Sequence, residues 1–246
     1  MARSARDFPL VSAALDDPAI RALFTERFLV ATEIYDALVD AACWKLLGDV
    51  GARPAPGEER DEESLLAQYP ERARPVLRYT IEKLTDAGFL LRRSGGASAA
   101  GVASTPPDAT APLHLLRESE SEFFISQSGR EPGGVGALAA ELAAVEPDAA
   151  VGAEIVSLLA DEGAAFLRGE KTGEEILFSP VRLPLWIRYF SNANVLYAIN
   201  NTLGAETLTR VLPASGAEVL EIGGGCGSAA EAALSRLGTR ASRCRR

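Results

Sequence analysis

The chain of 246 residues is 47% apolar and carries a formal net charge of -9. An acidic chain repels phosphate backbones and acidic membrane surfaces, so neither nucleic acid nor a membrane is an expected partner. No apolar run approaches the ~18 residues that a membrane span needs, and the N-terminus lacks a secretory cleavage pattern. The three cysteines (Cys43, Cys226 and Cys244) show no metal-ligand spacing, which predicts reduced thiols, no metal site and a cytoplasmic location.

The first segment, residues 16–93, is predicted to be helical. Asp16 and Asp17 before Pro18 form a typical helix start, and the apolar residues that follow recur on one face. Residues 51–64 are polar and contain prolines, which predicts a loop. A second amphipathic helix follows and ends at Gly88, and residues 89–91 then predict a short strand. The apolar stripe of this second helix consists of Leu77, Ile81 and Leu84.

The sequence LTDAGFLLRR, which ends at Arg93, resembles the end of a winged helix, where the last helix runs into a β-hairpin. Residues 94–112 are rich in Ser, Ala, Gly and Pro and predict a disordered wing tip. Residues 113–116 and 122–125 are candidate returning strands. We therefore expect a winged-helix-like domain over residues 16–125.

Residues 134–212 are predicted to be a helical linker region, with one helix over 147–169 and another over 184–200. The aromatic residues and the asparagines in and directly after the second helix each have two possible roles. The aromatic residues either line a substrate pocket or pack in a helix core, and the asparagines either bind a ligand or cap a helix break near Ser191. These residues are Trp186, Tyr189, Phe190 and Tyr197, and Asn192, Asn194, Asn200 and Asn201.

The sequence AEVLEIGGGCGSAA, residues 217–230, carries the chemistry. Residues 217–222 predict a strand, the glycines predict a turn, and residues 228–237 predict a helix. Glycines adopt positive φ and let a ligand approach the backbone, while a helix N-terminus offers free N–H groups. The segment therefore predicts a cradle for a nucleotide-like ligand.

Spacing only partly separates the two cofactor classes that use such a cradle. The dinucleotide pattern GxGxxG fails when counted from Gly223, but a GxGxxA match survives from Gly225 to Ala230. Glu221, two residues before Gly223, gives ExGxGxG, and this segment resembles motif I of class I S-adenosylmethionine-dependent methyltransferases. The resemblance implies that the acid helps to hold the methionine amino group of S-adenosyl-L-methionine while the glycines wrap the cofactor. The residues so implied are Glu221, Gly223, Gly224, Gly225 and Gly227.

The resemblance extends upstream to residues 177–213, which look like the helical approach to motif I in bacterial small-molecule methyltransferases with an N-terminal winged-helix-like domain. It implies methyl transfer to an oxygen, nitrogen or carbon of a small-molecule acceptor, and a homodimer formed through the N-terminal domain. The expected fold is thus a mainly α winged-helix-like domain and helical linker, followed over residues 213–246 by the first βα unit of an incomplete Rossmann-like methyltransferase domain.

The chain is expected to be truncated, because a methyltransferase sheet needs roughly 150 to 200 residues and only residues 217–246 follow the start of motif I. The arginine-rich residues 243–246 stand where the family has a ribose-binding acid, and the last nine residues, GTRASRCRR, suggest a shifted frame or truncated gene. The lone His114 is expected at the surface, and no catalytic base is assigned. The activity of this chain stays open, with a non-enzymatic winged-helix module carrying a vestigial loop, or a dinucleotide-binding oxidoreductase fragment, as alternatives.

Overall fold

The computed structural model describes residues 13–94, 122–126, 131–213 and 217–238. Its contacts divide the chain into two units, and α3 (Glu26–Asp49) and α7 (Ala150–Leu167) are each shared between them. Within the described ranges, no helix combines the length and the apolar character needed to cross a bilayer. The first unit comprises residues 1–38, 134–157 and 177–246, and the second comprises residues 39–133 and 158–176.

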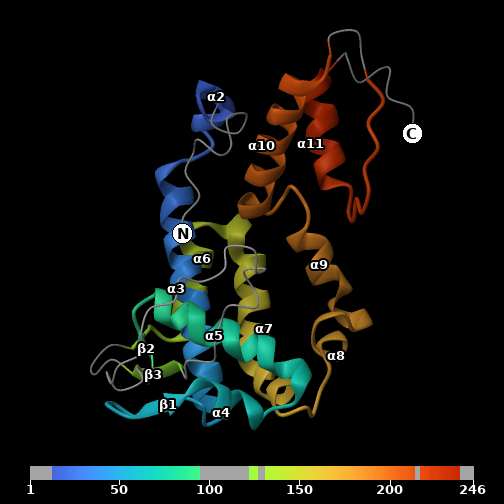
Figure 1. Ribbon diagram of the computed structural model, residues 1–246. Coiled ribbons are helices and arrows are strands. Elements are labelled where there is room, and N and C mark those ends of the chain that lie inside the picture. Colours follow the sequence, from blue (N-terminus) through green and yellow to red (C-terminus); the bar gives the residue numbers. More distant parts are fainter. Residues whose placement is uncertain (1–12, 95–121, 127–130, 214–216, 239–246) are drawn as a thin grey trace, which may run out of the picture. The chain divides into compact units, whose positions relative to one another are not determined.

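The second unit contains a three-stranded antiparallel sheet with strand order β1-β3-β2 (Figure 1). Ile125 of the central strand lies opposite Glu59 on one side and Leu91 on the other. Helices precede and separate the strands, giving the chain order helix, strand, two helices, two strands. The elements after α3 are β1 (Glu59–Asp61), α4 (Glu62–Ala67), the 3-10 helix η2 (Glu71–Ala73), α5 (Arg74–Asp86), β2 (Leu90–Ser94) and β3 (Glu122–Ser126).

The predicted strand near residue 90 and the returning strand at 122–125 are both present, as β2 and β3. The loop predicted over residues 51–64 is wrong at its end, because β1 and the first turn of α4 lie there. β1 consists of three charged residues at a sheet edge, so it shows none of the apolar alternation that marks a strand in the sequence. Residues 95–112 and 113–116 lie outside the described residues.

The core of the second unit is built on α5. The predicted stripe is confirmed, because all three of its members are fully buried. The helix ends as predicted at Gly88, which has a left-handed φ of 75°, and the Phe89 amide turns back to donate to the Leu84 carbonyl at 2.8 Å. Around the stripe pack further buried side chains, among them Leu47, Leu66, Leu90 and Leu167.

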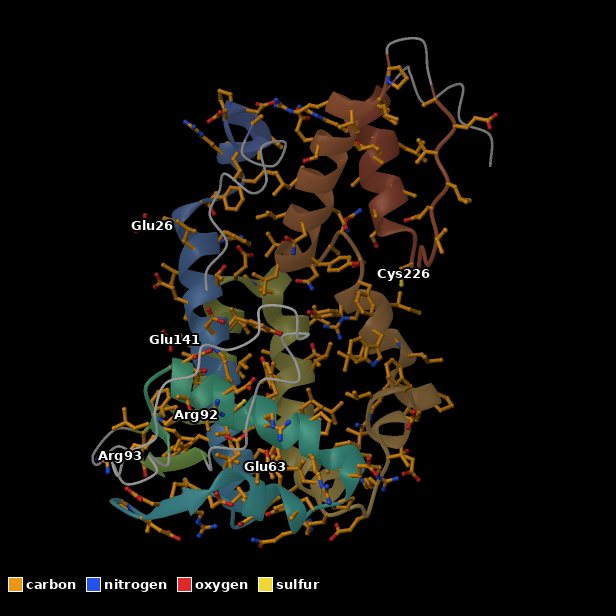
Figure 2. All side chains as sticks on the ribbon, viewed as in Figure 1. Glu26, Glu63, Arg92, Arg93, Glu141 and Cys226 are labelled. Carbon is orange, nitrogen blue, oxygen red and sulfur yellow. The ribbon has the colours of Figure 1, made fainter. Side chains whose placement is uncertain are left out.

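Arginines of α5 and β2 are paired with acids of α4 and β1. The nearly buried Glu62 carboxylate accepts from Arg92 Nη2 at 2.7 Å and from Arg78 Nε at 3.3 Å. Arg78 also pairs with Glu63 at 2.7 Å, and Arg93 on β2 pairs with Glu59 at 3.0 Å. Figure 2 labels Glu63, Arg92 and Arg93. A carboxylate buried as deeply as that of Glu62 needs such partners. Glu62 thereby ties α4 to α5 and β2.

All the regular elements in the described residues of the first unit are helices. It contains α2 (Pro18–Arg21), α6 (Val135–Val145), the 3-10 helices η3 (Pro147–Ala149) and η4 (Pro180–Arg182), α9 (Leu183–Tyr189), α10 (Val195–Val211) and α11 (Ser228–Leu237). The short α8 (Gly173–Leu177) crosses the boundary between the units. α10 and α11 pack side by side and run in the same direction (Figure 1).

Two predicted helices of this unit are interrupted. The helix that starts at Pro18 stops after one turn, and α3 begins anew where the Thr25 hydroxyl accepts from the Phe28 amide at 3.1 Å. The helix predicted over 184–200 is broken between α9 and α10 around Ser191, as one interpretation of its asparagines required. Short polar side chains satisfy helix ends, which is why a continuous apolar pattern still yields separate helices.

The close packing of α3 against α7 in the first unit gives a stability prediction. A Cβ on Gly152 of α7 would lie 2.7 Å from Cε2 of Tyr35, so Gly152→Ala is expected to lower the free energy of unfolding by about 1–3 kcal/mol. Gly204→Ala in α10 is the matched control: nothing lies within 4 Å, so removing a helical glycine should raise stability by roughly 0.5–1 kcal/mol. Urea denaturation of both variants measures the difference, and equal stability would contradict the packing.

Candidate cofactor-binding site

The segment before the glycines is not the predicted strand. Residues 217–222 have an irregular conformation, and Val219, Leu220 and Ile222 are 55%, 82% and 87% exposed. A parallel strand exists only through hydrogen bonds to neighbouring strands and burial of its faces, and in the described part of the chain no strand pairs with this segment. The apolar, β-rich composition therefore indicates a strand that has no partner here.

The glycine loop, residues 223–227, has the backbone that its composition predicts. Gly223, Gly225 and Gly227 have φ values of 74°, 53° and 77°, in the left-handed region that side chains disfavour. The Gly227 amide donates to the Gly224 carbonyl at 2.7 Å, which closes a tight turn, and α11 begins directly afterwards. Three left-handed glycines, at alternate positions of the loop, thus lead the chain into a helix N-terminus.

The predicted acid lies against this loop. A Cβ placed on Gly224 would be 2.8 Å from Oε2 of Glu221, so the carboxylate rests over Gly224. Glu221 and residues 223–226 are all exposed. Four of the five sequence-predicted residues therefore form one accessible surface, with the half-buried Gly227 at its helical end and a negative charge at the edge of the glycine turn.

The N-terminus of α11 completes the arrangement. Gly227 offers no side-chain cap, so the first amides of the helix point toward the loop without an intrahelical acceptor. An amide-lined helix start carries partial positive charge and binds electronegative ligand atoms. The exposed Cys226 stands immediately before it (Figure 2).

The four asparagines make hydrogen bonds within the fold. Asn194 is 1% exposed and donates to the Tyr189 carbonyl at 2.9 Å, and Asn200 donates to Leu196 within its own helix. Asn192 and Asn201 bond to each other and, through Asn192, to the first turn of α11. These contacts favour the helix-break interpretation over direct ligand binding.

The four aromatic residues singled out in the sequence pack on one another. Ring centroids lie 5.1 Å apart for Tyr189 and Phe190 and 5.5 Å apart for Phe190 and Tyr197. Phe178, which periodicity did not link to them, joins the cluster by stacking on Trp186 at 5.4 Å and is 54% exposed. The rings contact one another at a partly exposed surface, because α9 has no buried residue and Phe190 is 36% exposed.

The described cysteines behave as the sequence predicts for free thiols. Cys43 is buried, and burial together with the charge of Asp40 raises the pKa of its thiol to about 11. No group of three or more metal-ligating side chains occurs in the described ranges.

Arg236, at the end of α11, pairs with Glu206 and Asp17. Cys244, His114 and the arginines from 240 onward lie outside the described residues.

No protein-family model matches the sequence, and no curated protein matches it either. Among solved structures, the chain is similar to the CurJ carbon methyltransferase, with 19% identity and a TM-score of 0.59. It is also similar to the DszA carbon methyltransferase, with 17% identity and a TM-score of 0.58. A third similar structure is the CMeT domain of the citrinin polyketide synthase, with 15% identity and a TM-score of 0.55.

The likeness covers 94%, 95% and 93% of this chain but only 56%, 54% and 56% of those chains, respectively. The chain therefore has the fold of part of a carbon methyltransferase and spans little more than half the length of these structures.

Proposed function

We propose that the chain is part of an S-adenosylmethionine-dependent methyltransferase that acts on a small-molecule acceptor, and that the glycine loop with Glu221 binds the cofactor. The observation that carries this proposal is the left-handed glycine turn leading into α11, with the acid against it, in a chain folded like part of a carbon methyltransferase. The sequence motif admits oxygen, nitrogen or carbon as the methyl acceptor. The likeness to carbon methyltransferases favours carbon.

Charge favours this cofactor over a dinucleotide. S-adenosylmethionine carries a sulfonium, an ammonium and a carboxylate and is a net cation, whereas a dinucleotide presents a pyrophosphate with two negative charges. Glu221 lies against the loop, and Glu231 lies in the first turn of α11. Two carboxylates this close to the cradle attract a cation and repel a pyrophosphate.

The chemistry asked of this part of the protein is binding and orientation. When bound, S-adenosylmethionine supplies an activated methyl group to an acceptor that must approach in line with the methyl–sulfur bond. A carbon acceptor must first lose a proton to a general base. Among the described residues, we assign none to that role. The glycine loop and Glu221 would hold the cofactor, and the start of α11 would fix its direction.

We further propose that the second unit is a winged-helix-like module that serves dimerisation rather than DNA binding. Its order of helices and strands supports the winged-helix assignment. Arg78, Arg92 and Arg93, on α5 and β2, are already paired with acids of the same unit, which leaves less positive charge for a DNA backbone. The same module supports the alternative function, a non-enzymatic dimerisation or regulatory protein whose glycine loop is vestigial.

Thiol labelling during a cofactor titration tests the proposal at residue resolution. Cys226 is exposed within the loop, so N-ethylmaleimide should alkylate it readily, and saturating S-adenosylmethionine should slow this at least tenfold. Cys43 is the internal control: with a pKa of about 11, roughly one thiol in a thousand is ionised at pH 8, and burial blocks the reagent. Peptide mapping by mass spectrometry separates the two sites.

The outcomes distinguish the candidate functions. Protection of Cys226 together with a micromolar Kd in calorimetry supports the methyltransferase. Protection by NAD instead would assign the loop to a dinucleotide. A stable dimer that binds neither ligand would leave the non-enzymatic module as the function.

A further inference from the structure

The side chain of Asn192 connects three separate parts of the first unit. Its Nδ2 donates to the Ser228 carbonyl at 2.9 Å and to Glu231 Oε2 at 2.8 Å, both in the first turn of α11. Its Oδ1 accepts from Nδ2 of Asn201 in α10 at 2.9 Å. Both amide hydrogens and the carbonyl oxygen are therefore used, and this set of partners admits only one orientation of the amide.

The first turn of α11 is the element that directly follows the glycine loop, so its position sets the position of the loop. A second bond reinforces the connection, because the Ser228 hydroxyl donates to the Phe190 carbonyl and Ser228 is 6% exposed. At its other end, α11 is held by Arg236 against Glu206 of α10. The segment before the loop, residues 217–222, is irregular and exposed and makes no comparable bond among the described residues. The loop is thus anchored from its helical side.

Asn192 also orients a carboxylate beside the cradle. Glu231 is held by its bond to the Asn192 amide, so that its negative charge remains at the start of α11. A fixed carboxylate stabilises a bound cation better than one that must reorganise when the ligand arrives. Both effects act through other groups and require no contact between Asn192 and the ligand.

We propose that Asn192 is a positioning residue for cofactor binding: it ties the turn between α9 and α10 to the first turn of α11 and thereby holds the glycine loop and Glu231 in their binding arrangement. This inference rests on the proposed function. Asn192 lies in the break between α9 and α10, outside the glycine motif. The inference makes it a further determinant of affinity for S-adenosylmethionine.

The test compares Asn192→Ala with two matched variants. Asn200→Ala removes a nearby asparagine whose side chain donates within α10, to the Leu196 carbonyl at 3.3 Å. Gly152→Ala is expected to destabilise the same unit at a position that is far from the loop in sequence and that contacts Tyr35 of α3. We expect Asn192→Ala to weaken S-adenosylmethionine binding about tenfold and to speed amide hydrogen exchange over residues 223–231 in the free protein. Neither control should do either, and a merely structural loss would make Gly152→Ala behave like Asn192→Ala.

Failure of the inference and failure of the proposed function are distinguishable. Wild-type protein that binds the cofactor, alongside an Asn192→Ala variant with the same Kd and the same exchange rates, would overturn the inference alone. Wild-type protein that binds no S-adenosylmethionine would overturn both.

Discussion

Replacing Gly225 with valine is expected to weaken S-adenosylmethionine binding at least a hundredfold. Gly225 has a φ of 53°, and an ideal Cβ there would meet only the Gly223 carbonyl, at 3.9 Å. A side chain would therefore point into the open space of the cradle. A β-branched residue also resists the left-handed conformation, by roughly 1–2 kcal/mol, so the turn itself would shift. Steric exclusion and backbone distortion act in the same direction.

Gly57→Val is the matched control for the backbone effect. Gly57 has a φ of 80° in the second unit, and nothing lies within 4 Å of its Cβ position. The same substitution there should cost similar conformational strain but leave cofactor binding unchanged. Calorimetric titration of both variants measures the Kd, and circular dichroism confirms that each is folded. A Gly225→Val variant that binds as tightly as the wild type would remove the glycine loop from the cofactor site.

The features of this fold that the sequence predicts are local ones. The stripe of α5 is visible because apolar residues recur at the helical period, and all three members are buried. The glycine loop is visible because left-handed φ values are nearly restricted to glycine, so the residue types report the backbone directly. In both cases one short segment contains all the information that its conformation needs.

The features that sequence reasoning missed depend on partners distant in the chain. β1 is a strand only because Glu59–Asp61 pairs with β3, more than sixty positions later. Residues 217–222 have the composition of a strand but do not form one, because a strand needs a neighbouring strand to pair with. Composition indicates what a segment is able to form, and pairing decides whether it does.

The candidate site likewise contains residues that a local motif predicts and residues that only the tertiary structure brings together. Glu221 and the glycines lie within residues 221–227, so the sequence alone brings them together. The contact of Asn192 with Ser228 joins residues on different helices, and an asparagine-rich stretch equally suited capping. Phe178 was missed for the same reason, because its stacking on Trp186 joins the segment after α8 to α9. Side chains that position a site from outside its motif emerge only from the tertiary structure.

The second large effect is expected in the core of the second unit, where Leu77→Ala should lower the free energy of unfolding by about 2–5 kcal/mol. Leu77 is 0% exposed and lies in the cluster formed with Ile81, Leu84 and their neighbours. Removing its three outer carbon atoms loses their transfer free energy and leaves a cavity that a packed helical core fills only in part.

The adjacent Val76 supplies the control, because it is 39% exposed on the same helix. Val76→Ala also removes apolar atoms but leaves no cavity, so its cost should stay below about 1 kcal/mol. Urea denaturation followed by circular dichroism gives both values, and their difference reports which face of α5 is packed. Equal losses for the two variants would mean that α5 buries a different face from the one its periodicity predicts. A large loss for Leu77→Ala alone would establish that the module proposed for dimerisation has its own packed core.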